Sequence, residues 1–177
     1  MKLFKIYLII FACVLVFVLG SRFFPSHYYV EQTVIINKPV SETFAYMSNY
    51  HNWEQWSLWN KSVDSTLYYF YNQKHDTIGA RQYFYGALLG QGHFETIGYK
   101  KDSSIQFTLS VNRNDITAAG VFIFKAIDAN TTELHWIDSG NVGNNPIKRY
   151  MIPFVTKNTA KTLDGGLANI KKYMEMK

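Results

Sequence analysis

The chain has 177 residues, and once an apolar N-terminal segment is set aside the remainder has the length of one ordinary domain. Aromatic residues make up 17% of the chain, which favours β-strands, and the single cysteine lies in the apolar segment, which excludes an internal disulfide and a cysteine nucleophile in the domain. The net charge of +5 comes from the two ends of the chain, because residues 23–145 carry more acidic than basic residues, so a nucleic-acid-binding surface over the domain is not expected.

Residues 1–24 are predicted to form a transmembrane anchor. No charged residue occurs from Ile6 to Leu19, and Lys2 and Lys5 precede this run. A spanning helix needs roughly 17–25 residues, whereas the apolar core of a signal peptide has roughly 7–15, so a signal segment is the alternative. Basic residues before a spanning helix remain in the cytoplasm. We therefore expect a single-pass protein of the inner (cytoplasmic) membrane with its domain outside the cytoplasm.

Residues 25–29 form a linker, and residues 30–177 form the folded domain. A strand is expected at 28–37, where β-branched residues alternate with polar ones, and a short helix at 38–50 follows it. Six further strands of period two are expected at 66–72, 78–86, 91–99, 104–112, 116–127 and 131–138. The turns between them are short and polar or glycine-rich, which indicates a seven-strand antiparallel meander.

An amphipathic helix is predicted over residues 146–176. Its apolar positions recur with helical period and are Ile147, Tyr150, Met151, Phe154, Val155, Thr159, Leu163, Leu167, Ile170 and Met174. We expect burial against the sheet for Phe154, Leu163, Leu167 and Ile170. Pro153 is expected to kink or split the helix, and Gly165 and Gly166 to loosen it. One helix stripe covers only part of a seven-strand face, so a cavity is expected between them.

Four stretches of the sequence carry a resemblance to a known family: "VIINKPVSETFAYMSNYHNWEQWSLW", "GQGHFETIGYKKDSSIQFTL", "TTELHWIDSG" and "LDGGLANIKKYME". With them the chain resembles the SRPBCC superfamily, also called START-like or Bet v 1-like, and within it the bacterial polyketide cyclase/dehydrase and lipid-transport group. This resemblance implies an α+β helix-grip fold, in which a bent seven-stranded antiparallel sheet surrounds the long C-terminal helix. It does not imply one function, because this scaffold is associated with lipid carriers, receptors, aromatases and chaperone co-factors.

Three of the four tryptophans, Trp53, Trp56 and Trp59, lie within seven positions. The resemblance implies that Trp53 and Trp56 lie where short helices close one end of the helix-grip fold. They either pack this corner or line the mouth of a cavity, and Trp59 is expected to be partly exposed. The ligand-binding candidates are Trp53, Trp56, Trp59, Tyr83, Phe107 and Phe154.

The weak catalytic candidates are His93, Glu95 and Arg81. His93 and Glu95 lie two apart on a predicted strand and therefore share a face. If that face lines the cavity, they form an acid–base pair, with Arg81 and Tyr83 orienting an oxygenated ligand. The alternative is a solvated outer face with ordinary cross-strand pairs. His135 and Asp138 are expected on opposite faces of their strand.

No metal or cofactor is expected. The five histidines are scattered, and neither H-x-H nor H-E-x-x-H occurs. The glycine-rich stretch 86–92 lacks the lysine and helix of a phosphate-binding loop, so it is interpreted as a hairpin turn. The basic residues of the last helix either contact anionic lipid or form a solvated face.

These observations favour a membrane-tethered, non-catalytic binding or carrier domain for a small hydrophobic ligand such as a lipid, an isoprenoid or a polyketide-like molecule. One alternative is an enzyme of the cyclase/dehydrase kind that uses polar residues in the cavity. The other is a protein-interaction module whose cavity is collapsed. No nucleic-acid partner is expected, and the sequence leaves the oligomeric state open.

Overall fold

A computed structural model describes residues 2–112 and 116–176. The chain begins with a helix and a single 3-10 turn, α1 (Lys2–Gly20) and η1 (Ser21–Phe23). The domain follows in the order β1 (His27–Ile36), α2 (Val40–Ser48), α3 (Tyr50–Trp56), β2 (Tyr68–Tyr71), β3 (Arg81–Gly86), β4 (Gly90–Lys100), β5 (Ser104–Val111), β6 (Ile116–Asp128), β7 (Thr131–Asn141) and α4 (Pro146–Glu175). The predicted order of elements is therefore confirmed, with the expected helix at 38–50 forming α2 and a second helix, α3, carrying two of the tryptophans.

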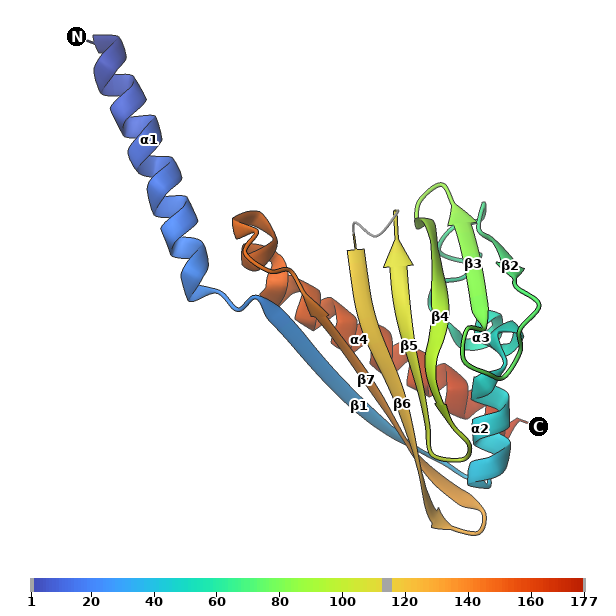
Figure 1. The fold of residues 1–177 in the computed structure, drawn as a ribbon. Helices are drawn as coiled ribbons and strands as arrows, with labels where there is room; N and C mark the ends of the chain where they lie inside the picture. Colours follow the sequence, from blue (N-terminus) through green and yellow to red (C-terminus); the bar gives the residue numbers. More distant parts are fainter. Residues whose placement is uncertain (1, 113–115, 177) are drawn as a thin grey trace.

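The seven strands form one antiparallel sheet in the order β1-β7-β6-β5-β4-β3-β2. The sheet curves, and α4 runs across its concave face (Figure 1). Side chains on each strand alternate between this concave face and the outer face, as in β7, where Thr132, Leu134 and Trp136 are buried. This is the helix-grip fold that the sequence predicts.

Helix α4 is continuous over its 30 residues, so Pro153 does not split it, and a kink stays the predicted effect of this proline. Pro153 is exposed, so its ring lies outside the packed side of the helix. Further along, Gly166 is buried against Trp136, and a Cβ at this position would lie 2.6 Å from the indole ring. The glycine therefore permits the helix to approach the sheet closely at this point.

Leu163, Leu167 and Ile170 are buried against the sheet as predicted, but Phe154 is 64% exposed, which corrects the expectation of its burial. The predicted stripe advances largely by steps of four residues. At 3.6 residues per turn, each such step drifts by about 40° around the helix. The four steps from Ile147 to Leu163 therefore carry the stripe to nearly the opposite side. The predicted apolar stripe therefore contains residues from two different faces of α4, one buried and one exposed.

Helix α1 projects away from the domain on the side where α4 begins (Figure 1). The span Leu3–Phe23 is long and apolar enough to cross a membrane and is not buried by the domain, features that a signal sequence shares. The two helices meet at Tyr150, whose hydroxyl donates a hydrogen bond to the carbonyl oxygen of Phe17 at 2.9 Å. The aromatic rings of these residues stack with centroids 4.8 Å apart.

Candidate functional site

One end of the concave face, next to α2 and α3, is filled with aromatic rings. Trp53 and Trp56 project from α3 into the core and are only 3% and 1% exposed. The Trp53 indole N–H donates to the carbonyl oxygen of Met47 at 2.8 Å, and the Trp53 ring meets the Phe107 and Phe122 rings at centroid distances of 5.1 and 5.7 Å. This geometry favours the corner-packing interpretation of Trp53 and Trp56.

The space beside this corner, at the β2 and β3 edge, is also closed. It leaves no room for a water molecule between its walls, which are formed by Trp53, Ser57, Trp59, Leu67, Tyr69, Gln82, Phe84 and Phe94. Trp59 is half-buried here, as expected, and packs edge-on against Phe84 with centroids 5.2 Å apart. An apolar ligand therefore has no space at the Trp53–Trp59 side of the grip.

The other end of the concave face, which we call the open end, is lined by Leu109, Ala118, Gly140 and Tyr28 across the four strands β5, β6, β7 and β1. These residues remain partly exposed, whereas Ile105 and Phe122, two rows deeper in the sheet, are buried. The open end is the one nearest α1 and the beginning of α4 (Figure 1). The grip is therefore sealed at one end and accessible at the other.

Tyr28 and Asp138 form a polar pair just inside the open end. The Tyr28 hydroxyl donates to the Asp138 carboxylate at 2.8 Å. The Tyr28 ring lies over Gly140, where a Cβ would come within 2.5 Å of it, so the glycine allows the ring to reach Asp138. Burial raises the pKa of Asp138 to about 6, although the hydrogen bond from Tyr28 opposes this rise. Burial and the neighbouring carboxylate raise the pKa of Tyr28 as well.

Two buried indole donors lie deeper in the core, one on β7 and one on α3. Trp136 is two residues before Asp138 on β7, and its ring crosses that of Trp56 at 89° with centroids 5.5 Å apart. Within the described chain, the Nε1 atoms of Trp56 and Trp136 are buried and have no hydrogen-bond partner. An unpaired buried donor costs about 1–3 kcal/mol, so such groups in a native structure need an explanation. A ligand with an acceptor oxygen is one explanation.

The predicted catalytic cluster is brought together, but on the outer face of the sheet. Arg81 and Glu95 form an ion pair at 2.9 Å, His93 lies 4.0 Å from Glu95, and Arg81 donates to the Tyr83 hydroxyl at 3.3 Å. Burial, reinforced by the positive charge of Arg81, lowers the pKa of His93, while Glu95 opposes this. The side chains of this cluster point away from α4, so the interpretation of a solvated outer face with cross-strand pairs holds.

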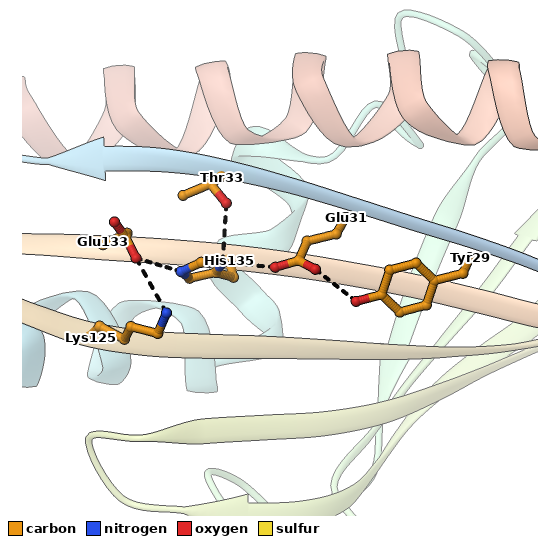
Figure 2. A network of polar contacts seen from close by, with 6 residues as sticks. All are labelled: Tyr29, Glu31, Thr33, Lys125, Glu133 and His135. Atoms are coloured by element: carbon orange, nitrogen blue, oxygen red, sulfur yellow. Dashed lines mark hydrogen bonds and ion pairs between the residues drawn. The ribbon is translucent and has the colours of Figure 1, made fainter.

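A second polar network lies on the outer face around His135 (Figure 2). The His135 ring contacts Glu31 at 2.9 Å through Nδ1 and Glu133 at 2.6 Å through Nε2. The hydrogen bond from Tyr29 is the main cause that lowers the pKa of Glu31, and the contact with His135 is the main cause for Glu133. His135 and Asp138 thus lie on opposite faces, as predicted. Among residues 2–112 and 116–176, no group of three or more His, Cys, Asp or Glu is arranged to hold a metal ion.

Of the predicted ligand-binding residues, Trp53, Trp56, Trp59 and Phe107 therefore belong to the concave core, whereas Tyr83 and Phe154 point away from it. Sequence reasoning missed Tyr28 and Asp138. A signal was present, because Asp138 falls in phase with Leu134 and Trp136, and a carboxylate in phase with a buried face is uncommon.

The curved sheet closed by one long C-terminal helix, with a polar pair inside its open end, defines a protein of the SRPBCC class with a Bet v 1-like fold. The sequence model of the family described as polyketide cyclase/dehydrase and lipid transport matches residues 28–175. The chain therefore belongs to that family. No curated protein sequence matches it.

Solved structures share the fold at low sequence identity. Ara h 8.0201 has a TM-score of 0.61 at 9% identity, with 85% of this chain and 99% of that chain covered. The di-domain ARO/CYC protein BexL from the BE-7585A biosynthetic pathway has a TM-score of 0.59 at 14% identity, and the match covers 84% of this chain but only 46% of BexL. A hypothetical protein from Helicobacter pylori, jhp0584, has a TM-score of 0.59 at 10% identity, with 83% and 88% covered. These similarities define the fold alone.

Proposed function

We propose that this protein is a membrane-tethered, non-catalytic binding or carrier domain for a small hydrophobic ligand that carries a polar oxygen group. In this proposal α1 is the tether, and the ligand enters at the open end of the grip, between the first half of α4 and the sheet. The single observation that carries the proposal is the partly exposed open end of the concave face, with the Tyr28–Asp138 pair just inside it. Small-molecule sites typically combine apolar walls with a few polar groups in this way.

Adding bulk at the open end tests the proposal. Ala118 lies on the concave side of β6, and its neighbour Ala119 is exposed on the outer face. We expect Ala118→Phe to abolish binding of fatty acids or isoprenoids to the full-length protein in detergent, because the new ring fills the entrance. Ala119→Phe, the matched control, should leave binding unchanged. Native mass spectrometry for co-purified lipid and saturable quenching of tryptophan emission are the measurements.

A result in which neither the parent protein nor the control binds any apolar ligand overturns the carrier proposal. The packed tryptophan corner would then favour the interaction module with a collapsed cavity. Unchanged binding in Ala118→Phe would show that the ligand does not enter at Ala118, and equal loss in Ala118→Phe and Ala119→Phe would show that filling the entrance is not the cause; either result also contradicts the proposal.

An enzyme of the cyclase/dehydrase kind is a second candidate, and one observation favours it. The pKa of Asp138 is raised to about 6, which suits a general acid or base near neutral pH. This role would fall to Asp138 and Tyr28, because His93, Glu95 and Arg81 face away from the concave side. Recovery of chemically unchanged ligand after prolonged incubation with the protein supports the carrier, whereas conversion that Asp138→Asn abolishes supports the enzyme.

A further inference from the structure

One face of α4 near its beginning is apolar and exposed. Ile147, Met151 and Phe154 are spaced four and three residues apart, so they lie on one side of the helix, and they are 62%, 50% and 64% exposed. Ile152, on the other side, is buried. Rotating α4 to bury the apolar face against the sheet would therefore expose Ile152. The helix can bury only one of these two sides, and the face of Ile147, Met151 and Phe154 is left without a partner in the domain.

The same stretch of α4 is basic. Residues 146–163 contain no acidic residue, and their basic residues are Lys148, Arg149, Lys157 and Lys161. Lys157 and Lys161 are exposed. An apolar helical face accompanied by cations is the pattern of helices that lie in the membrane interface, where the apolar side chains enter the headgroup region and the cations meet anionic lipid.

The contact between α4 and α1 determines how deep this face of α4 lies relative to a bilayer that α1 crosses. Tyr150 bonds and stacks with Phe17, which lies inside the apolar span Leu3–Phe23. At 1.5 Å per residue, Phe17 is about 9 Å from the end of that span. When α1 crosses a bilayer, the Tyr150 hydroxyl therefore lies about 9 Å inside the end of the span, within the depth of roughly 5–10 Å to which interfacial helices bury their apolar face, and Ile147 and Met151 flank Tyr150 within one helical turn.

A groove between α1 and α4 favours lipid rather than protein as the partner of this face. It has a volume of about 580 Å³ and is lined by Ala12, Cys13, Val16, Phe17, Gly20 and Tyr150. Its walls are mainly apolar, and most of them belong to α1. Acyl chains surround a spanning helix at this level, so lipid is already the neighbour of the groove and of the exposed face of α4.

We infer that the first turns of α4, from Ile147 to Phe154, dock into the headgroup region of the bilayer that α1 crosses, with anionic phospholipid as the partner. This inference rests on the proposed tether and deepens the proposed function, because docking holds the open end of the grip at the membrane surface. An apolar ligand then passes between bilayer and protein without crossing water.

The test places a single environment-sensitive fluorophore on the full chain, in a Cys13→Ser background, at one of three sites. Met151→Cys probes the docking face, Leu8→Cys probes α1, and Ile127→Cys is the matched control. Ile127 is an exposed apolar residue beside the β6–β7 hairpin, which lies far from α1 (Figure 1). Each protein is reconstituted in phosphatidylcholine vesicles with and without phosphatidylglycerol, and quenching by nitroxide-labelled lipid is measured.

We expect strong quenching at Leu8→Cys, clear quenching at Met151→Cys and none at Ile127→Cys. Quenching at Met151→Cys should increase with phosphatidylglycerol, decrease with salt and weaken when Lys157→Gln and Lys161→Gln are added. Two basic residues near an anionic surface change the docking equilibrium by roughly thirtyfold.

Quenching at Leu8→Cys without quenching at Met151→Cys overturns the docking and leaves the tether in place. Equal quenching at Met151→Cys and Ile127→Cys overturns it as well, because the domain would then adhere without a defined face. Absence of quenching at Leu8→Cys overturns the tether and the docking together. A protected Met151→Cys fluorophore that nitroxide lipid does not reach would point to a protein partner on this face and would also contradict the inference.

Discussion

Asp138 carries a charge that this fold accommodates poorly, because its carboxyl is buried. It lies on the concave face and has a single described hydrogen-bond partner, Tyr28. A carboxylate on the outer face such as Glu31 is different, because it accepts a hydrogen bond from Tyr29 and contacts His135. Ionisation of these two acids, which lie on neighbouring strands, thus has opposite effects on the stability of the fold, because they lie on opposite faces of the sheet.

We predict that Asp138→Asn stabilises the protein at neutral pH and not in acid. The pKa of Asp138 rises from 3.8 in the unfolded chain to about 6 in the folded one. The contribution of Asp138 to the free energy of unfolding is therefore fully present below about pH 4 and is lost as the pH rises through about 6. Asparagine removes this loss and retains an acceptor for Tyr28. We expect a gain of about 1–3 kcal/mol at about pH 8 and none near pH 4 in chemical unfolding of the detergent-solubilised protein.

Glu31→Gln is the control with the opposite sign. The pKa of Glu31 is lowered, chiefly by the hydrogen bond from Tyr29, so its ionised form stabilises the fold above the unfolded pKa and this contribution is lost as pH falls. The variant should be less stable than the parent protein at neutral pH and equal to it in acid. A stability profile of Asp138→Asn that runs parallel to that of the parent protein at all pH values would contradict the assignment of a buried, reluctantly ionised carboxyl.

At the scale of elements, α4 is fixed to the sheet by the close approach at Gly166. The adjacent Gly165 has a different neighbour, because a Cβ there would meet the end of the flexible Leu58 side chain at 2.9 Å. A Cβ at Gly166 would instead meet the rigid indole of Trp136, which is held by Phe122 and Trp56 on its other sides. A side chain is therefore restricted by a rigid neighbour at Gly166 but only by a flexible one at Gly165.

We predict that Gly166→Ala destabilises the protein by about 1–3 kcal/mol, because the methyl group overpacks the contact with Trp136. Gly165→Ala should be neutral or stabilising by up to about 1 kcal/mol, since Leu58 can change rotamer and alanine favours the helix. Thermal and urea unfolding of both variants measure the difference. Similar effects for the two substitutions would show that helix propensity, rather than the contact with Trp136, decides this part of α4.

At the scale of the molecule, the protein combines a helix that is exposed along its length with a folded domain that contacts it through Tyr150. The contacts between α1 and the rest of the chain concentrate near its end, where Phe17, Phe24 and Tyr150 meet. A helix exposed in this way leaves the uncharged run from Ile6 to Leu19 in water, which is unfavourable unless a bilayer covers it.

We predict that the full chain remains in the membrane fraction after carbonate extraction and that its domain is digested by protease added to spheroplasts. Both results follow from a retained α1 with Lys2 and Lys5 on the cytoplasmic side. A soluble product with a new N-terminus near Ser21 would show a cleaved signal segment instead. Protection of the domain in intact spheroplasts would reverse the orientation.

The sequence predicts the fold well because the signals are local and repeated. The period of two in strands such as 104–112, the short turns between strands and the long C-terminal helix leave few ways to bury the apolar faces. Alternation also shows that His93 and Glu95 share a face, but not which one. A β-bulge between Thr96 and Gly98 shifts the phase of β4, so that Tyr99 and His93, six positions apart, no longer point to the same side.

The candidate site is less accessible to sequence reasoning because it depends on contacts between distant segments. Tyr28 and Asp138 are 110 positions apart and meet only because β1 pairs with β7. The unpaired indoles of Trp56 and Trp136 come from α3 and β7, and whether an indole N–H finds a partner is a property of the finished packing. The exposure of Phe154 was within reach of sequence reasoning, because the nine positions between Phe154 and Leu163 place them on opposite sides of a helix.

The continuity of α4 across Pro153 has a kinetic consequence. A helix of 30 residues is about 45 Å long, so α4 reaches from the open end of the grip to the sealed one, and we expect it to move as one rod. Because it lacks a break near the entrance, the entrance cannot widen by folding back one short segment. Widening requires the whole rod to tilt against the sheet, which loosens the distant Gly166–Trp136 contact at the same moment. Ligand exchange is therefore expected to be slow and to accelerate in Gly166→Ala, a site far from where the ligand enters.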